Sequence, residues 1–329
     1  MTPLQFEALY QAEWDELETL LDRVLGRSGA GRRRDPSEEI PGARVAALYR
    51  RACEQLALAR ARAYPTYIVD RLERLTADGH QVIYRGHEFG FARLKQMLAI
   101  EFPRAVRKQW RYVAAASAIF VIPTIAVGLL IYWRPELILA VVSPETAASF
   151  EEMYSPGAES IGRVRDASTD WIMFGYYIRN NIGVAFQCFA GGLFAGVGSL
   201  FFLAYNGAFG GAVAGYLTER GLSSTFYSFV ATHAAFELTA IVLSGAAGLR
   251  IGHALLAPGR LTRRQALVEA TRESATILYG ITAMLVVAAG IEAFWSSARW
   301  LAPAVKYSVA AMCWVAVLAY LTMQGRRAG

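Results

Sequence analysis

Charged side chains are scarce in this sequence, and lysine is rarer still. Asp, Glu, Lys and Arg make up 18% of the 329 residues, against 55% for hydrophobic residues. Of the 33 basic residues, only three are lysines: Lys95, Lys108 and Lys306. Arginine therefore carries most of the positive charge. With a mean hydropathy of +0.30, this composition argues against a soluble globular protein and indicates a membrane protein.

Cysteine is also rare, which excludes two kinds of structural framework. Cys53, Cys188 and Cys313 lie far apart, and the last two stand inside apolar runs. Such a scattered set forms neither a disulfide framework nor a thiolate zinc site. We do not expect a cleavable signal peptide either, because six acidic residues fall within the first 25. The N-terminus is therefore expected to stay in the cytoplasm.

Residues 1–110 predict a cytoplasmic helical domain. Thr2, Pro3 and Gln5 form the capping-box start of a helix, and large apolar residues then recur every three or four positions. This first helix is acidic outside its apolar stripe. A linker rich in Gly, Arg and Pro, at about residues 26–42, leads to a second helix that is basic. The acidic helix is expected to pack beside the basic one.

Residues 111–329 predict a transmembrane domain of about six helices. Residues 112–131 hold no charge over 20 residues, which is about the length needed to cross ~30 Å of hydrocarbon. Residues 180–218 hold none over 39 residues, which fits two spans joined by a turn near 196–199. The predicted spans are residues 112–131, 180–198, 199–217, 224–249, 274–291 and 307–323. The predicted fold class is therefore all-α, a polytopic helical membrane protein.

The charges between these spans predict an orientation. Residues 134–170 carry seven acids and three arginines, whereas residues 250–274 carry five arginines and two acids. Loops rich in Arg and Lys tend to stay in the cytoplasm. Six crossings then place both termini and residues 250–274 inside, and residues 134–170 outside.

Glycine is concentrated in the second and third predicted spans, at the small-xxx-small spacing of closely packed membrane helices. One interpretation is tight packing within the chain, and the other is a face that also mediates homodimer formation. The candidate packing residues are Gly192, Gly196, Gly207, Gly211 and Gly215.

His233 and Glu237 are the most unusual polar residues of the apolar segments. They stand four apart and so share one helix face, and ionisable residues at such depth are costly unless paired or hydrated. If the neighbouring spans form antiparallel hairpins, Asn206 lies level with this pair and Gln187 lies level with Asn206. We therefore predict one intramembrane cluster of Gln187, Asn206, His233 and Glu237.

Three interpretations of this cluster remain open: mutual hydrogen bonding between helices, a path for protons or ions, and a metal site. Two good ligands, His233 and Glu237, are fewer than the three of a catalytic zinc site, so we expect no metal. The sequence also contains no nucleophile triad, phosphate-binding glycine loop or pair of catalytic carboxylates. We therefore expect no catalytic residue, no cofactor and no enzymatic activity.

The order of these motifs resembles the stage II sporulation protein M family over about residues 112–325. The motifs are Asn180-Asn181, the Gly-x-Gly turn, Asn206-Gly207, Gly210-Gly211, His233 four before Glu237, and Gly245-Ala246-Ala247-Gly248-Leu249-Arg250. The family pattern Pro-His-Gly-x-x-Glu reads Thr-His-Ala-Ala-Phe-Glu here. The resemblance implies an all-helical integral protein of the bacterial cytoplasmic membrane, and its founding members act beside peptidoglycan-cleaving partners. The long N-terminal domain is similar to that of relatives outside sporulation.

From the residues and the resemblance together, we expect a non-enzymatic component of an envelope-associated complex. The expected location is the inner membrane, with multiple passes and both termini in the cytoplasm. The expected partners are the lipid bilayer and either a second copy of the chain or other membrane or envelope proteins, with no nucleic acid. The alternatives are an ion- or proton-coupled transporter or channel and, third, an intramembrane metal-dependent hydrolase.

Overall fold

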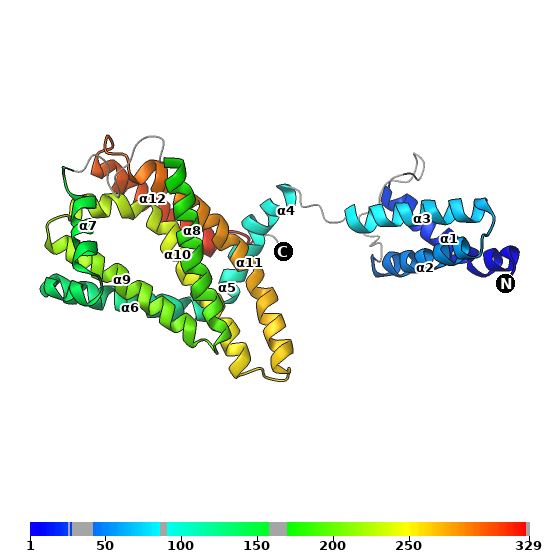
Figure 1. Ribbon diagram of the computed structural model, residues 1–329, viewed down its shortest axis with the longest axis horizontal. Helices are drawn as coiled ribbons and strands as arrows, with labels where there is room; N and C mark the ends of the chain where they lie inside the picture. The colour runs from blue at the N-terminus through cyan, green and yellow to red at the C-terminus, as the bar shows by residue number, and fades with distance from the viewer. Residues whose placement is uncertain (26, 28–41, 86–90, 158–169, 327–329) are drawn as a thin grey trace. The chain divides into compact units, whose positions relative to one another are not determined.

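The computed structural model describes residues 1–25, 27, 42–85, 91–157 and 170–326, and every regular element within them is helical (Figure 1). This confirms the all-α class. The chain divides into two compact units, Met1–Arg93 and Leu94–Gly329. Residues 94–110, which we had assigned to the N-terminal domain, belong to the second unit, because Phe102 and Val106 pack into the core of the membrane helices.

The N-terminal unit consists of α1 (Pro3–Leu25), α2 (Gly42–Ala61) and α3 (Thr66–Arg85). The predicted capping box is present, since the Thr2 N–H donates to Gln5 Oε1 over 3.1 Å and the Gln5 N–H donates to Thr2 Oγ1 over 3.3 Å. Phe6 and Trp14 lie on the buried stripe of α1, and the Trp14 indole N–H donates to Gln55 Oε1 of α2 over 2.7 Å. The unit therefore has a core of its own.

The acidic helix α1 packs beside the basic helix α2, as the sequence predicted, and ion pairs connect them. Arg44 of α2 lies 2.6 Å from Glu16 of α1, and Arg51 pairs with Glu13. The hydrogen bonds from the Arg44 guanidinium lower the pKa of the Glu16 carboxyl. Arg71 of α3 adds a third contact to the acidic face of α1, at 2.5 Å from Asp15.

Among the described residues of the second unit, five helices are long and apolar enough to cross a membrane. They are α6 (Trp110–Trp133), α9 (Val197–Glu219), α10 (Ser223–Leu256), α11 (Arg263–Gly290) with its continuation η5 (Ile291–Ser296), and α12 (Pro303–Met323). The other elements are α4 (Phe91–Gln96), η1 (Met97–Glu101), α5 (Phe102–Lys108), η2 (Pro135–Ala140), α7 (Pro144–Tyr154), α8 (Asp170–Ala190) and η4 (Gly191–Leu193).

Helices α6 and α9 lie side by side and run in the same direction (Figure 1). Three glycines of α9, one turn apart, face backbone carbonyls on three successive turns of α6. A Cβ on Gly207, Gly211 or Gly215 would lie 2.2, 2.1 or 2.2 Å from the carbonyl oxygens of Phe120, Thr124 and Gly128, respectively. Since both sets of residue numbers rise together, the two helices are parallel, and the chain must return along the bundle between them.

Helix α8 makes that return. Near its start, Tyr177 packs against Ala289 of α11 and Ala293 of η5. Near its end, the Cys188 carbonyl accepts a hydrogen bond from Ser199 Oγ over 2.6 Å, at the beginning of α9. α8 is less apolar than its neighbours because it contains Arg179 and two asparagines.

The helices on either side of this turn have other bounds than the predicted spans. α8 begins at Asp170 rather than at 180, and the turn into α9 occupies residues 191–196 rather than 196–199. The charge at Arg179 ended our apolar window although the helix continues through it. The turn ends at Gly196, whose φ of 86° is in the left-handed region that glycine adopts without strain.

The remaining candidate glycines also make contacts within the chain. A Cβ on Gly192 would lie 2.2 Å from the Gly248 carbonyl oxygen of α10. A Cβ on Gly252 would lie 2.3 Å from the backbone nitrogen of Gly196. All five candidate glycines therefore face backbone or side-chain atoms of the same chain at short range.

We expect Gly211→Ala to lower the free energy of unfolding by about 1–3 kcal/mol, because the new methyl group has no room beside the Thr124 carbonyl. Thermal unfolding of the purified protein in detergent measures this loss. Gly210→Ala is the matched control, since a Cβ there meets nothing within 4 Å. Equal stability of the two variants would contradict the α6–α9 contact.

Candidate functional site

His233 and Glu237 lie one turn apart on the inward face of α10. The His233 Nε2 is 4.0 Å from the Glu237 Oε2, which is an ion-pair distance but too long for a hydrogen bond. His233 is 5% exposed, and Glu237 is partly buried. At 1.5 Å per residue, His233 lies about 15 Å along the helix from its first residue. The pair is thus enclosed by the bundle.

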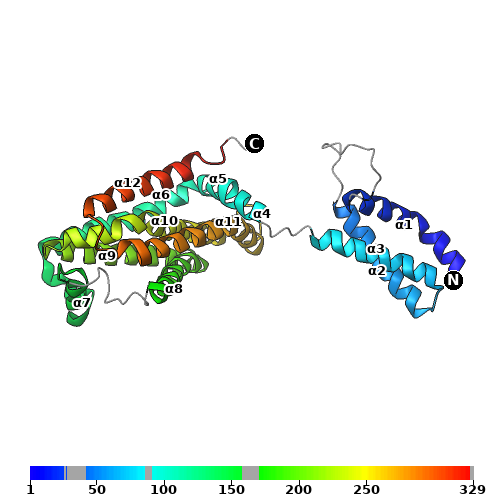
Figure 2. The same cartoon turned by 90° about the horizontal axis from the view of Figure 1, so that it is seen from above.

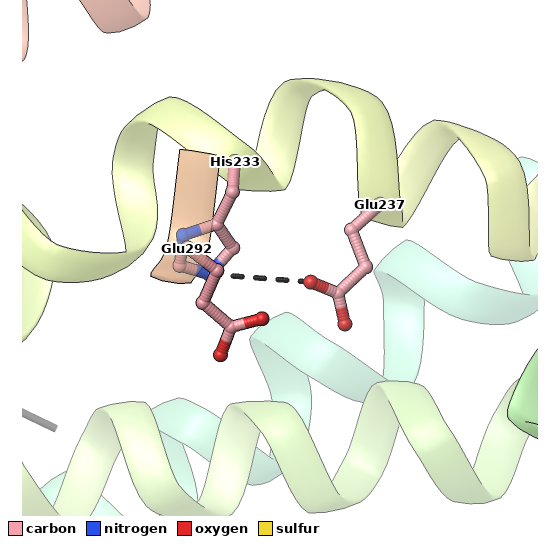
Figure 3. Close-up of side chains that lie close together, drawn as sticks. All are labelled: His233, Glu237 and Glu292. Atoms are coloured by element: carbon pink, nitrogen blue, oxygen red, sulfur yellow. Dashed lines mark ion pairs between the residues drawn. The ribbon is translucent and has the colours of Figure 1, made fainter. Parts of the chain in front are cut away.

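A third ionisable side chain, Glu292 of η5, joins this pair. One nitrogen of His233 and one carboxylate oxygen each from Glu237 and Glu292 all lie within 4.8 Å of one another. Figure 3 shows the three side chains close together, with His233 and Glu237 on neighbouring turns of α10. We call His233, Glu237 and Glu292 the ionisable triad.

The histidine ring is oriented by the same segment that supplies Glu292. The His233 Nδ1 is 2.9 Å from the Ser296 Oγ, and both groups are buried. η5 is a π-helix, in which each backbone N–H bonds to the carbonyl five residues before it, so the turn is wider than in an α-helix. Glu292 and Ser296, four residues apart on this wide turn, both approach α10.

Lys306 of α12 adds a third helix to the polar contacts around the triad. Its side chain is 1% exposed, and its Nζ donates to the Ser296 carbonyl over 2.8 Å. Thr232 of α10 in turn donates to the Lys306 carbonyl over 3.3 Å. Polar contacts therefore connect α10, η5 and α12 around the triad.

The structure brings together only part of the predicted cluster. His233 and Glu237 face each other, but the Asn206 amide donates to the Phe202 carbonyl of its own helix over 2.7 Å. Gln187 lies exposed on α8. Within the described residues, no hydrogen bond connects Asn206 or Gln187 to His233 or Glu237. The sequence analysis compared only the positions of these residues along antiparallel spans. Such a comparison contains no information on how each helix is rotated about its own axis.

Two polar residues of the site were missed by the sequence analysis. Glu292 is the sole charged residue between Glu273 and Arg299, and Lys306 is the sole one between Arg299 and Arg326. A lone charge in an apolar stretch of such length is the signal that would have found them. We had ended the fifth span at 291 and so placed Glu292 outside it.

Together, the helices and the enclosed triad define a polytopic all-helical membrane protein with ionisable residues between its helices. The chain belongs to the stage II sporulation protein M family, whose model matches residues 117–297. That match confirms the resemblance seen in the sequence, and it includes all three members of the ionisable triad. A second family model, described as Domain of unknown function (DUF8413), matches residues 4–85. The curated proteins and the solved structures yielded no match.

We expect Ser296→Ala to destabilise the protein by about 1–3 kcal/mol, because it leaves the buried His233 Nδ1 without its hydrogen-bond partner. Ser297→Ala is the control, since the Ser297 hydroxyl donates only to the Ala293 carbonyl of the preceding turn. Thermal unfolding in detergent compares the two. A larger loss for Ser297→Ala than for Ser296→Ala would show that the contact with His233 contributes little.

Proposed function

We propose that this chain is a multi-pass protein of the bacterial cytoplasmic membrane that acts as a non-enzymatic component of an envelope-associated complex. Membership of the stage II sporulation protein M family and the five membrane-length helices support an integral membrane protein. The partners are the surrounding lipids and either a second copy of the chain or another membrane or envelope protein.

The observation that carries this proposal is the backbone contact between α6 and α9. Three glycines of α9 approach carbonyl oxygens of α6 so closely that no side chain fits between the helices. A contact of this kind resists sliding, since each glycine occupies a fixed place along its neighbour. A helix bundle that resists such sliding keeps a fixed surface, which suits a component that holds other proteins in position.

The distribution of charge supports the orientation. One end of the second unit, the arginine-rich end, combines α5 with the turn between α10 and α11. Its basic residues are Arg104, Arg107, Lys108, Arg260, Arg263 and Arg264. At the opposite end, the acidic end, η2 and α7 carry Glu136, Glu145, Glu151 and Glu152. By the positive-inside tendency, the arginine-rich end and both termini are cytoplasmic.

The N-terminal unit is the part that we assign to partner binding in the cytoplasm. Its described residues form a core of their own, and large apolar side chains lie outside that core. Leu4 and Leu9 of α1 are 75% and 58% exposed. Large apolar residues on the surface of a small unit are a common feature of docking faces.

The second candidate function is ion- or proton-coupled transport. The observation that favours it is the ionisable triad, because such residues between membrane helices often mark a path for ions or protons. The scaffold and the transporter differ in one measurable property, the flux of ions across the membrane.

The orientation predicts the labelling of single cysteines introduced after replacement of Cys53, Cys188 and Cys313. A membrane-impermeant thiol reagent added to intact spheroplasts is expected to modify Glu152→Cys and to spare Arg264→Cys until the membrane is opened. Both positions are exposed in the structure, so accessibility of the side chain is matched. Labelling of Arg264→Cys alone would reverse the proposed orientation.

The scaffold proposal predicts that the protein can be crosslinked to a partner protein and that it conducts no ions. A photo-crosslinking amino acid at Leu9 is expected to capture a discrete membrane or envelope protein in living cells, whereas the same amino acid at buried Trp14 captures none. In proteoliposomes, the purified protein is expected to conduct protons and alkali-metal ions no faster than empty vesicles. A flux that Glu237→Gln abolishes would instead establish the transporter.

A further inference from the structure

We propose that His233, Glu237 and Glu292 form a binding site for one divalent transition-metal ion of the zinc class. The sequence alone offered only His233 and Glu237, which is one protein ligand short of an open zinc site. The fold supplies the third from η5, 55 positions further along the chain. This site goes beyond the scaffold function and does not depend on it.

The ligand atoms are of the right type and nearly at the right separation. Zinc bonds to histidine nitrogen at about 2.0–2.1 Å and to carboxylate oxygen at about 2.0–2.2 Å, so tetrahedral ligand atoms lie roughly 3.3 Å apart. The His233 Nε2 and Glu237 Oε2 are 4.0 Å apart, and all three ligand atoms lie within 4.8 Å of one another. Binding of one ion requires the two glutamate side chains to rotate so that these separations shorten to those of a metal site.

The histidine is already held in the orientation that a metal ligand requires. The Nδ1 lies 2.9 Å from the Ser296 Oγ, and in the tautomer that donates its Nδ1 proton to this hydroxyl the Nε2 lone pair is on the side of Glu237. Metal-binding histidines generally have their second ring nitrogen fixed by such a hydrogen bond, which selects the tautomer. Here Ser296 makes this hydrogen bond, and Glu292 is the third ligand. Both residues belong to η5.

The π-helix of η5 is a second, independent observation that favours a site. Single π-turns at the end of an α-helix are uncommon and occur often at functional positions. This one lies where α11 would otherwise continue as an α-helix, and it places Glu292 opposite the His233–Glu237 face. A metal ion at that position connects α10 to the end of α11. Three protein ligands leave a fourth tetrahedral position for water.

The test measures metal bound to the full-length protein in detergent. After treatment with a chelator and dialysis against micromolar Zn²⁺, the wild type is expected to retain one zinc ion per chain by elemental analysis. Each of His233→Gln, Glu237→Gln and Glu292→Gln is expected to weaken the affinity at least about tenfold. Retention of wild-type affinity by Glu237→Gln and Glu292→Gln, or the absence of bound zinc in the wild type, overturns the proposal.

Two control variants match the site in residue type. Glu273→Gln removes a carboxylate whose side chain is 24% exposed, against 20% for Glu237, and which pairs with Lys108 and Arg250. His253→Gln removes the histidine that contacts Tyr112 at the other end of α10. Both are expected to keep zinc affinity within about twofold of the wild type, and a tenfold loss in either counts against the assignment.

A measurement on the wild type keeps the test decisive if the variants fold poorly. X-ray absorption at the zinc edge is expected to show nitrogen and oxygen ligands with the scattering signature of one imidazole ring. Sulfur ligands, or the absence of an imidazole, would place the ion elsewhere and overturn the proposal. Zinc is also expected to raise the midpoint of thermal unfolding of the wild type, because a ligand that binds only the folded state stabilises it.

Discussion

The close approach of glycine backbones is the contact on which the rest of the membrane unit depends. Gly211 meets backbone atoms of Thr124 and Gly192 meets backbone atoms of Gly248, so no rotation of a side chain can relieve these contacts. In a lipid environment, where apolar side chains gain little by leaving the lipid, this close packing is a main source of helix association. It also fixes the rotation of α10, which carries both Gly248 and the polar residues that matter most.

One face of α10 carries glycines near the arginine-rich end of the unit and ionisable side chains nearer the acidic end. Gly252, Gly248, Glu237 and His233 follow one another at spacings of 4, 11 and 4 residues, which keeps them on one helix face. The glycines bring neighbouring backbones into contact, and further along the same face the ionisable pair meets η5. One surface of one helix therefore combines the tightest packing with the most polar contacts.

Polar groups at such depth persist only with partners, because an unsatisfied group in a dry environment costs several kcal/mol. Ser296 contacts the His233 ring through its hydroxyl and receives the Lys306 ammonium at its carbonyl. These contacts join three helices at one point. The wide turn of η5 makes this possible, since it presents the Glu292 carboxylate and the Ser296 hydroxyl to α10 together.

Much of the architecture was readable in the sequence because it depends on local patterns. Uncharged runs located the five helices of membrane length, periodic apolar residues and the Thr2 cap located α1, and the motif order around His233 identified the family. The meeting of Glu292 with His233 was not readable in the sequence, and the hydrogen bond of Asn206 is to its own helix rather than to His233. Hydrophobic length sets where a helix crosses, but the residues that meet depend on helix rotation. That rotation is decided by glycine contacts and a π-turn distant in the chain, which a local pattern does not contain.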